Sequence, residues 1–130
     1  MNNDVPPDID PAIRTIAMPA DTNPAGDIFG GWLLSQMDLA AGSVAARHAR
    51  GRCATMAVDK IVFVEPVKVG DEVTVYAELI STGRTSMQFE VTAWRRRRDG
   101  EDVRKVTGAI FTFVALDLDG RPRAIRPLVR

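Results

Sequence analysis

One long segment with helical periodicity precedes four long strand-like segments, and this order constrains the fold more than any other feature. Residues 30–50 are rich in Leu, Ala and Met, which form helices well, and their apolar and polar side chains separate at 100° per residue. The strand-like segments are residues 55–64, 72–80, 85–95 and 103–116. A parallel sheet needs crossover helices, which this order does not supply. The sequence therefore predicts an α+β fold.

In this fold an antiparallel sheet of about five strands, counting a short one within residues 12–18, curls around one long central helix. Residues 1–11 are rich in Pro, Asn and Asp and are expected to form a flexible tail. Residues 12–125 form the domain, and residues 126–130 form a C-terminal tail. A sheet that covers one helix leaves apolar positions on its other face and two open edges. These features favour self-association.

Charge and composition argue against several classes of partner. The chain has 17 basic and 17 acidic side chains, so its net charge does not steer it towards nucleic acid. The arginine run 95–98 is followed by acids at 101 and 102 and is expected to form a solvated hairpin tip. Trp32 and Trp94 are interpreted as core or interface side chains rather than base-stacking platforms. We expect no nucleic-acid partner.

No apolar run approaches the roughly 20 residues that a membrane span needs, and the N-terminus does not have the pattern of a signal peptide. Cys53 is the single cysteine, which excludes a disulfide within the chain and fits a reducing cytoplasm. One cysteine and one histidine, His48, do not supply a usual zinc site. We expect a cytoplasmic protein with no metal, no cofactor and no membrane association.

Asp38 is the most informative single residue. It lies four residues after Leu34 and seven before Ala45, which places it on the apolar arc of the predicted helix. A carboxylate there is costly to bury without partners. Gly31 and Gly42 lie on nearly the same face, where small residues let a backbone or a ligand approach closely. Asp38 is therefore a candidate catalytic residue; the alternative is a hydrogen-bonded aspartate at a subunit contact with no chemistry.

The helix starts with Gly30 and Gly31, whose backbone amides have no partner within the helix. The helix dipole adds partial positive charge at this end, so the amides are candidates to stabilise an oxyanion. Asp38 lies about two turns further on, roughly 10 Å from the helix start. On this geometry, Asp38 of one subunit can act together with the helix start of another. A tight helix entry without chemistry remains the alternative.

The segment MPADTNPAGDIFGGWLLSQMD, residues 18–38, resembles the YciA-like acyl-CoA thioesterases of the hotdog-fold superfamily. Further matches are the GRTS turn at 83–86, VFVEPVKVGD at 62–71, FTFVALD at 111–117 and GRPR at 120–123. The resemblance covers nearly the whole chain. It implies the fold predicted above, a homodimer with active sites at the interface, and a hexamer built as a trimer of dimers.

The resemblance also implies roles for individual residues. It makes Asp38 the catalytic carboxylate, acting as general base or as nucleophile, and Gly30 and Gly31 the source of the amides that polarise the thioester carbonyl. Asn23 and Asp27 fall in the active-site loop. Asn23 is expected to orient water or the carbonyl. For Asp27, an active-site role and a structural role as helix-entry cap stay open.

For coenzyme A, the resemblance points to the turn formed by Gly83, Arg84, Thr85 and Ser86. Arg84, Arg121 and Arg123 are candidates to bind the nucleotide phosphates, although each alone is more typical of a solvated surface charge.

The implied reaction is hydrolysis of acyl-CoA thioesters to a carboxylic acid and coenzyme A. The rival hypothesis from another class is a non-catalytic acyl-CoA sensor on the same fold. Other enzyme templates lack the residues they need, since His48 lies near the far end of the helix and no G-x-S-x-G motif is present.

Overall fold

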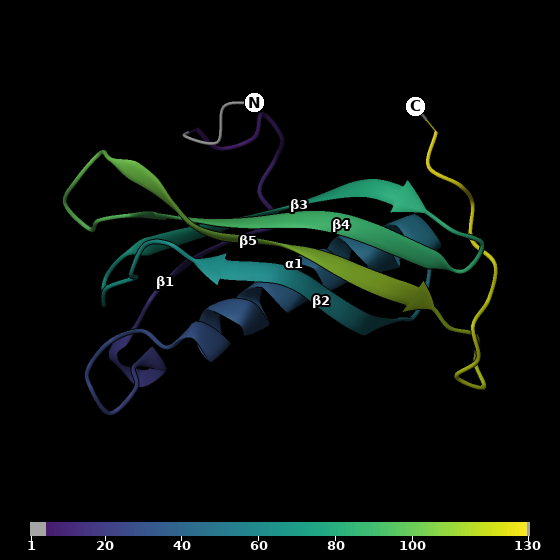
Figure 1. Ribbon diagram of the computed structural model, residues 1–130, viewed down its shortest axis with the longest axis horizontal. Helices are drawn as coiled ribbons and strands as arrows, with labels where there is room; N and C mark the ends of the chain where they lie inside the picture. The colour runs from purple at the N-terminus through teal and green to yellow at the C-terminus, as the bar shows by residue number, and fades with distance from the viewer. Residues whose placement is uncertain (1–4, 130) are drawn as a thin grey trace.

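The structure is a computed structural model that describes residues 5–129, and Figure 1 shows one long helix lying against a curved antiparallel sheet. The elements, in chain order, are β1 (Ile13–Ile16), a short 3-10 helix η1 (Pro19–Asp21), α1 (Gly30–Ala49), β2 (Cys53–Phe63), β3 (Glu72–Thr82), β4 (Ser86–Arg96) and β5 (Val103–Ala115). Each predicted element is present, with ends that move by a few residues.

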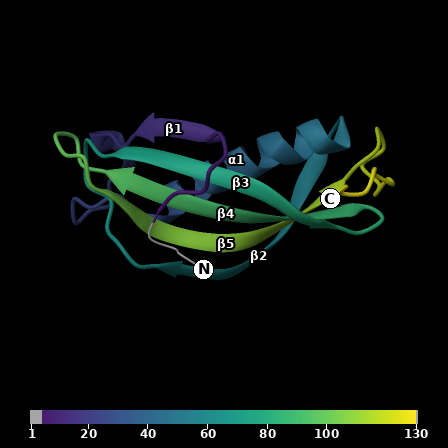
Figure 2. The ribbon, with the colours of Figure 1, turned by 90° about the horizontal axis from the view of Figure 1, so that it is seen from above.

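The five strands form one sheet in the order β1-β3-β4-β5-β2, and every neighbouring pair is antiparallel. The strands on either side of α1 in the sequence, β1 and β2, lie at opposite edges of the sheet. The helix therefore crosses one whole face of the sheet between them (Figures 1 and 2). This arrangement confirms the predicted hotdog fold.

The core lies between α1 and the inward face of the sheet. Three phenylalanines from the two central strands fill it: Phe89 meets Phe113 edge to face at a centroid distance of 5.8 Å, and Phe111 stacks on Phe113. Gly42 of α1 packs over the Phe113 ring, because a Cβ at this position would lie 3.5 Å from it. This is an ordinary van der Waals distance, so the contact does not by itself require a glycine at 42.

The helix ends at Ala49, one residue earlier than predicted. Arg50 takes the left-handed conformation (φ 54°, ψ 47°), and its amide bonds to the carbonyl of Ala46. Gly51 follows the turn, where a Cβ would lie 2.7 Å from an Nη atom of Arg123. A side chain at position 51 would therefore require the Arg123 guanidinium to shift.

The segments outside the sheet contact the body of the domain. The chain ahead of β1 crosses over the sheet face opposite α1 (Figure 2), and the amide of Ala12 bonds to the carbonyl of Val75. At the other end, Leu128 N donates to Thr82 Oγ1 at 2.9 Å, and His48 Nε2 lies 3.0 Å from the Arg126 carbonyl. Contacts thus continue beyond residue 125. Residues 1–4 and 130 of the predicted tails lie outside the described residues.

Within residues 5–129, no helix is both long enough and apolar enough to cross a membrane.

The interpretation of residues 95–98 as a solvated hairpin tip is wrong for most of the run. Arg95 is buried and pairs with Glu65, while Arg97 pairs with the buried Asp71. β4 extends through Arg96, so the run begins inside the sheet. The sequence pattern missed these pairs because the two acids lie about 30 residues away along the chain.

Candidate active site

Asp38 lies near the middle of α1 on the side that faces β2, where it is half-buried. Thr55 of β2 donates a hydrogen bond from Oγ1 to Asp38 Oδ1 at 2.6 Å. Pairing of Thr55 with Phe113 places the threonine on the helix-facing side of the sheet. The carboxylate is therefore fixed through one oxygen by a partner in its own chain. Thr55 is a site residue that sequence reasoning missed, since a threonine in a strand carries no signal of such a contact.

The start of α1 is open to a ligand. The residue ahead of the helix is Phe29, which makes no side-chain cap, and the first turn contains no acid. Among residues 5–129, the amides of Gly30 and Gly31 donate no hydrogen bond. A Cβ at Gly30 would lie 3.2 Å from the Phe63 ring, so a larger residue would require the ring to move by a few tenths of an ångström. The two amides can serve as donors to an oxyanion.

Asn23 organises the loop that leads to the helix. Its Oδ1 accepts hydrogen bonds from the amides of Ala25 at 3.0 Å and Asp27 at 3.1 Å, and its own amide bonds to the Asp27 carbonyl at 2.7 Å. The side-chain nitrogen of Asn23 takes no part in these bonds. The loop is therefore built on the Asn23 carbonyl oxygen, and the amide end of the side chain stays available.

Asp27 does not cap the helix, so that alternative is wrong. The helix begins two residues later than a cap at 27 would require, and Asp27 forms an ion pair with Lys68, with Oδ1 and Nζ 3.9 Å apart. Asp27 thus faces the connection between β2 and β3 rather than the helix amides.

A small pocket of about 210 Å³ opens beside the first residue of α1. It is lined mainly by apolar side chains of the helix entry, the end of β2 and the segment after it: Ile28, Phe29, Gly30, Leu33, Phe63, Glu65, Pro66, Val67 and Val106. Asp38 does not line it. Asp38 lies eight positions after Gly30 along the helix, a rise of about 12 Å. Within one chain, the structure therefore does not bring the helix start and the carboxylate together.

The predicted coenzyme A residues gather at the other end of the molecule. The turn between β3 and β4 is closed by a bond from the Gly83 amide to the Ser86 carbonyl, at 2.9 Å. The amide of Ile125 bonds to the carbonyl of Arg84, so the C-terminal segment lies against this turn (Figure 1). Thr85 also joins the sheet, since its carbonyl accepts from the Ala115 amide. The structure thus brings the 83–86 turn and the 120–125 segment together.

The three candidate arginines differ in their surroundings. The side chains of Arg84 and Arg121 are exposed. Arg123 is half-buried and donates from Nε to the Leu116 carbonyl at 3.0 Å and from Nη2 to the Ala49 carbonyl at 2.8 Å. Ala49 is the last residue of α1, so Arg123 caps the C-terminus of the helix. This structural role was not anticipated, and it takes up two of the donors that phosphate binding would use.

Cys53 at the start of β2 is a poor nucleophile. Burial raises the pKa of its thiol above the ordinary value of 9.0, against a smaller opposing effect of Arg123. A protonated thiol does not attack a thioester at neutral pH.

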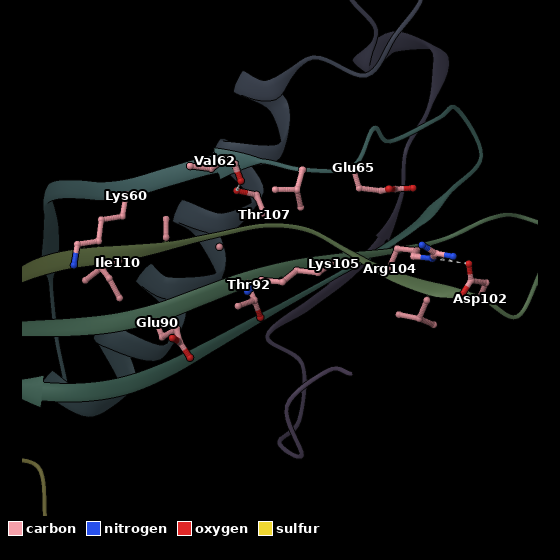
Figure 3. A pocket seen from close by; sticks show the side chains of 14 residues that line it. Lys60, Val62, Glu65, Glu90, Thr92, Asp102, Arg104, Lys105, Thr107 and Ile110 are labelled. Carbon is pink, nitrogen blue, oxygen red and sulfur yellow. Dashed lines mark hydrogen bonds and ion pairs between the residues drawn. The ribbon is translucent and has the colours of Figure 1, made fainter. Parts of the chain in front are cut away.

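A larger groove of about 920 Å³ lies on the sheet face opposite α1. Figure 3 shows side chains of both signs along it, with Lys60 and Glu90 towards one end and Arg104 and Asp102 towards the other. Lys60 has a positive φ of 60° at a register shift between β2 and β5, so the edge strand bulges at this point. The groove contains none of the predicted site residues.

The single long helix on an antiparallel sheet, with its open helix start, places the chain in the class of hotdog-fold proteins. Residues 25–100 match the family model of the thioesterase superfamily, and the chain belongs to this family. It is 54% identical over 119 residues to an uncharacterised acyl-CoA thioester hydrolase of Zymomonas mobilis, covering 92% of this chain and 80% of the relative.

The chain is also 44% identical over 122 residues to the acyl-CoA thioester hydrolase YciA of Escherichia coli, covering 92% of each protein. Among solved structures, it resembles a hexameric broad-specificity acyl-coenzyme A thioesterase, crystallised as a mutant in which an aspartate is replaced by alanine. The TM-score is 0.85 at 43% identity, covering 89% of this chain and 86% of that chain. The resemblance to YciA-like thioesterases is confirmed.

Proposed function

We propose that the protein hydrolyses acyl-CoA thioesters to a free carboxylic acid and coenzyme A. The observation that carries the proposal is Asp38, a helix carboxylate fixed through one oxygen by Thr55 on the face towards β2. The 44–54% identity to acyl-CoA thioester hydrolases over most of the chain supports the same reaction.

The complete site needs a second copy of the chain. Asp38 and the helix start are about 12 Å apart along α1, farther than one scissile bond spans. Among residues 5–129, β2 pairs with β5 alone and so has one open edge, next to the exposed Met56, Val62 and Val64. Antiparallel pairing of two β2 edges would cover these residues and continue the sheet. Asp38 of one subunit would then face the helix start of the other.

In this composite site, the amides of Gly30 and Gly31 receive the carbonyl oxygen as it gains negative charge. Asp38 removes a proton from water, whose oxygen attacks the carbonyl carbon; the C–S bond breaks, and the thiolate of coenzyme A takes up a proton. Direct attack by Asp38 would give a mixed anhydride that water then opens. Asn23 supplies its side-chain N–H groups to orient the carbonyl or the water. Both routes need the Thr55 hydrogen bond to aim the carboxylate.

The outer parts of the substrate fit the rest of the surface. The 83–86 turn, with the exposed Arg84 and the nearby Arg121, is placed to hold the pantetheine and phosphate groups. The solved relative is hexameric, and we propose for this protein a hexamer built as a trimer of dimers. A cytoplasmic location and the absence of a cofactor stay predictions.

The test is thiol release from a panel of acyl-CoAs by the wild type and by Asp38→Asn, which keeps the shape and removes the charge. We expect hydrolysis by the wild type and a loss of about 10²- to 10⁴-fold in kcat for the variant, with binding of coenzyme A retained. A wild type that binds acyl-CoA but releases no thiol above background would instead establish the acyl-CoA sensor.

A further inference from the structure

Glu65 is shared by the two hollows of the molecule. Of the residues that line the small pocket beside Gly30 and the groove on the opposite sheet face, Glu65 is the one that lines both. It lies on the connection that follows β2, and Figure 3 shows its side chain extending away from the strand. The other residues of the small pocket are apolar or glycine. The single charged residue that lines the small pocket thus also lines the larger groove.

The side chain of Glu65 is held in place from β4. Arg95 donates from Nη2 to Glu65 Oε1, and Arg97 lies 3.8 Å from the same oxygen. The Arg95 side chain is only 7% exposed, and its Nη1 is fixed by the carbonyl of Asp102 at 3.3 Å. A guanidinium that is buried and tied at two points does not swing aside, so the carboxylate bound to it does not either.

The connection between β2 and β3 is secured at its far end as well. Arg97 donates to Asp71 Oδ2, and the same oxygen accepts from the Lys68 amide at 2.8 Å. Pro66 and Val67, which line the small pocket, lie between these two acidic anchors. The ion pairs therefore fix a wall of the pocket and not only one side chain.

We propose that the Arg95–Glu65 ion pair is the partition that ends the acyl pocket and sets the upper limit of acyl chain length. The inference rests on the proposed function. A thioester whose carbonyl oxygen meets the Gly30 amide has its acyl chain next to the apolar pocket that Gly30 lines. The pocket of about 210 Å³ holds roughly seven non-hydrogen atoms, taking about 30 Å³ for each as for a water molecule. An acyl chain longer than this meets the Arg95–Glu65 ion pair.

The decisive variant is the double substitution Glu65→Ala with Arg95→Met. It removes both charges together, because a single change would leave its partner as an uncompensated buried charge, whereas apolar replacement of both is tolerated. Alanine opens the partition to the groove of about 920 Å³, and methionine fills the buried place of Arg95. The matched variant Glu65→Leu with Arg95→Met removes the same charges but keeps a bulky wall.

A control pair, Glu72→Ala with Arg96→Met, breaks a neighbouring ion pair whose residues do not line the pocket. The measurement is kcat/KM for acyl-CoAs from four to sixteen carbons. We expect the wild type to lose at least tenfold between eight and sixteen carbons. The alanine double variant should raise the ratio of kcat/KM for the sixteen-carbon substrate to kcat/KM for the four-carbon substrate at least tenfold. The leucine variant and the control should change it less than threefold.

A wild type that hydrolyses eight- and sixteen-carbon substrates equally well would overturn the inference, whether or not any variant folds. The inference would also be overturned if the alanine double variant matched the wild type in circular dichroism and assembly and kept the same sixteen-to-four-carbon ratio of kcat/KM. Both results leave thioester hydrolysis intact. A wild type that releases no thiol from any acyl-CoA would overturn the proposed function and this inference with it.

Discussion

Thr55 Oγ1 lies 2.6 Å from Asp38 Oδ1 and ties the central helix to the edge strand that follows it. The bond spans only 17 residues of sequence, yet it exists because β2 returns alongside α1 at the sheet edge. It leaves Asp38 with one oriented oxygen and one oxygen to act on water or on the substrate.

Thr55→Val should lower kcat by about 10- to 100-fold with little change in KM. The variant keeps the shape of the side chain and removes a hydrogen bond to a charged group, worth roughly 1.5–3 kcal/mol. Steady-state thiol release measures the effect. Thr112→Val, in β5 on the opposite sheet face by strand alternation, is the matched control and should retain full activity. Equal activity of wild type and Thr55→Val would show that the bond is only structural.

Two substitutions at Asn23 should separate its loop-building oxygen from its side-chain nitrogen. Asn23→Asp keeps the acceptor for the amides of Ala25 and Asp27, so its stability should stay close to that of the wild type. Asn23→Ala loses the acceptor and should cost about 1 kcal/mol in urea unfolding. Both should lose about tenfold in kcat if the nitrogen orients the carbonyl or water. Full activity of Asn23→Asp would limit the residue to the loop.

Arg123→Met should destabilise the fold by about 1–3 kcal/mol, because it removes a cation that satisfies the carbonyls of Ala49 and Leu116. Arg121→Met replaces an exposed arginine two residues earlier in the chain. Its urea unfolding midpoint should equal that of the wild type within error. Chemical denaturation followed by circular dichroism compares them. Equal midpoints would mean that the helix C-terminus does not depend on Arg123.

The double variant Arg84→Met with Arg121→Met should raise KM for acyl-CoA by about three- to tenfold and leave kcat unchanged, since it removes charge-assisted phosphate contacts that substrate and transition state share. Acyl-pantetheine, which lacks the nucleotide phosphates, should be hydrolysed equally by the variant and the wild type. A KM effect that is the same for both substrates would rule out phosphate binding by these arginines.

Stability should fall in acid partly through Glu65. The hydrogen bond from Arg95 holds the pKa of the Glu65 carboxyl below its ordinary value of 4.5. The unfolded chain then binds more protons than the folded one as pH falls below about 5. The contribution of the ion pair is therefore complete near neutral pH and lost as pH falls through the folded-state pKa. Urea midpoints between pH 6 and 3 should drop less steeply for Glu65→Leu with Arg95→Met. Parallel curves would contradict this linkage.

The sequence by itself determined the elements and their order, because the helical period of 30–50 and the alternation in the strands follow from local side-chain placement. It also singled out Asp38, since an acid on an apolar helix arc is visible without coordinates. The glycines at the helix start were equally visible. These signals depend only on residues within a few positions of one another.

The tertiary structure decided which distant residues meet. It paired Thr55 with Asp38, placed Arg123 under the end of α1, and buried Arg95 against Glu65. None of these contacts follows from spacing along the chain, because each depends on how the sheet curls around the helix. The rise of α1 itself keeps Asp38 about 12 Å from the helix start, and for that reason we assign the complete site to two copies of the chain.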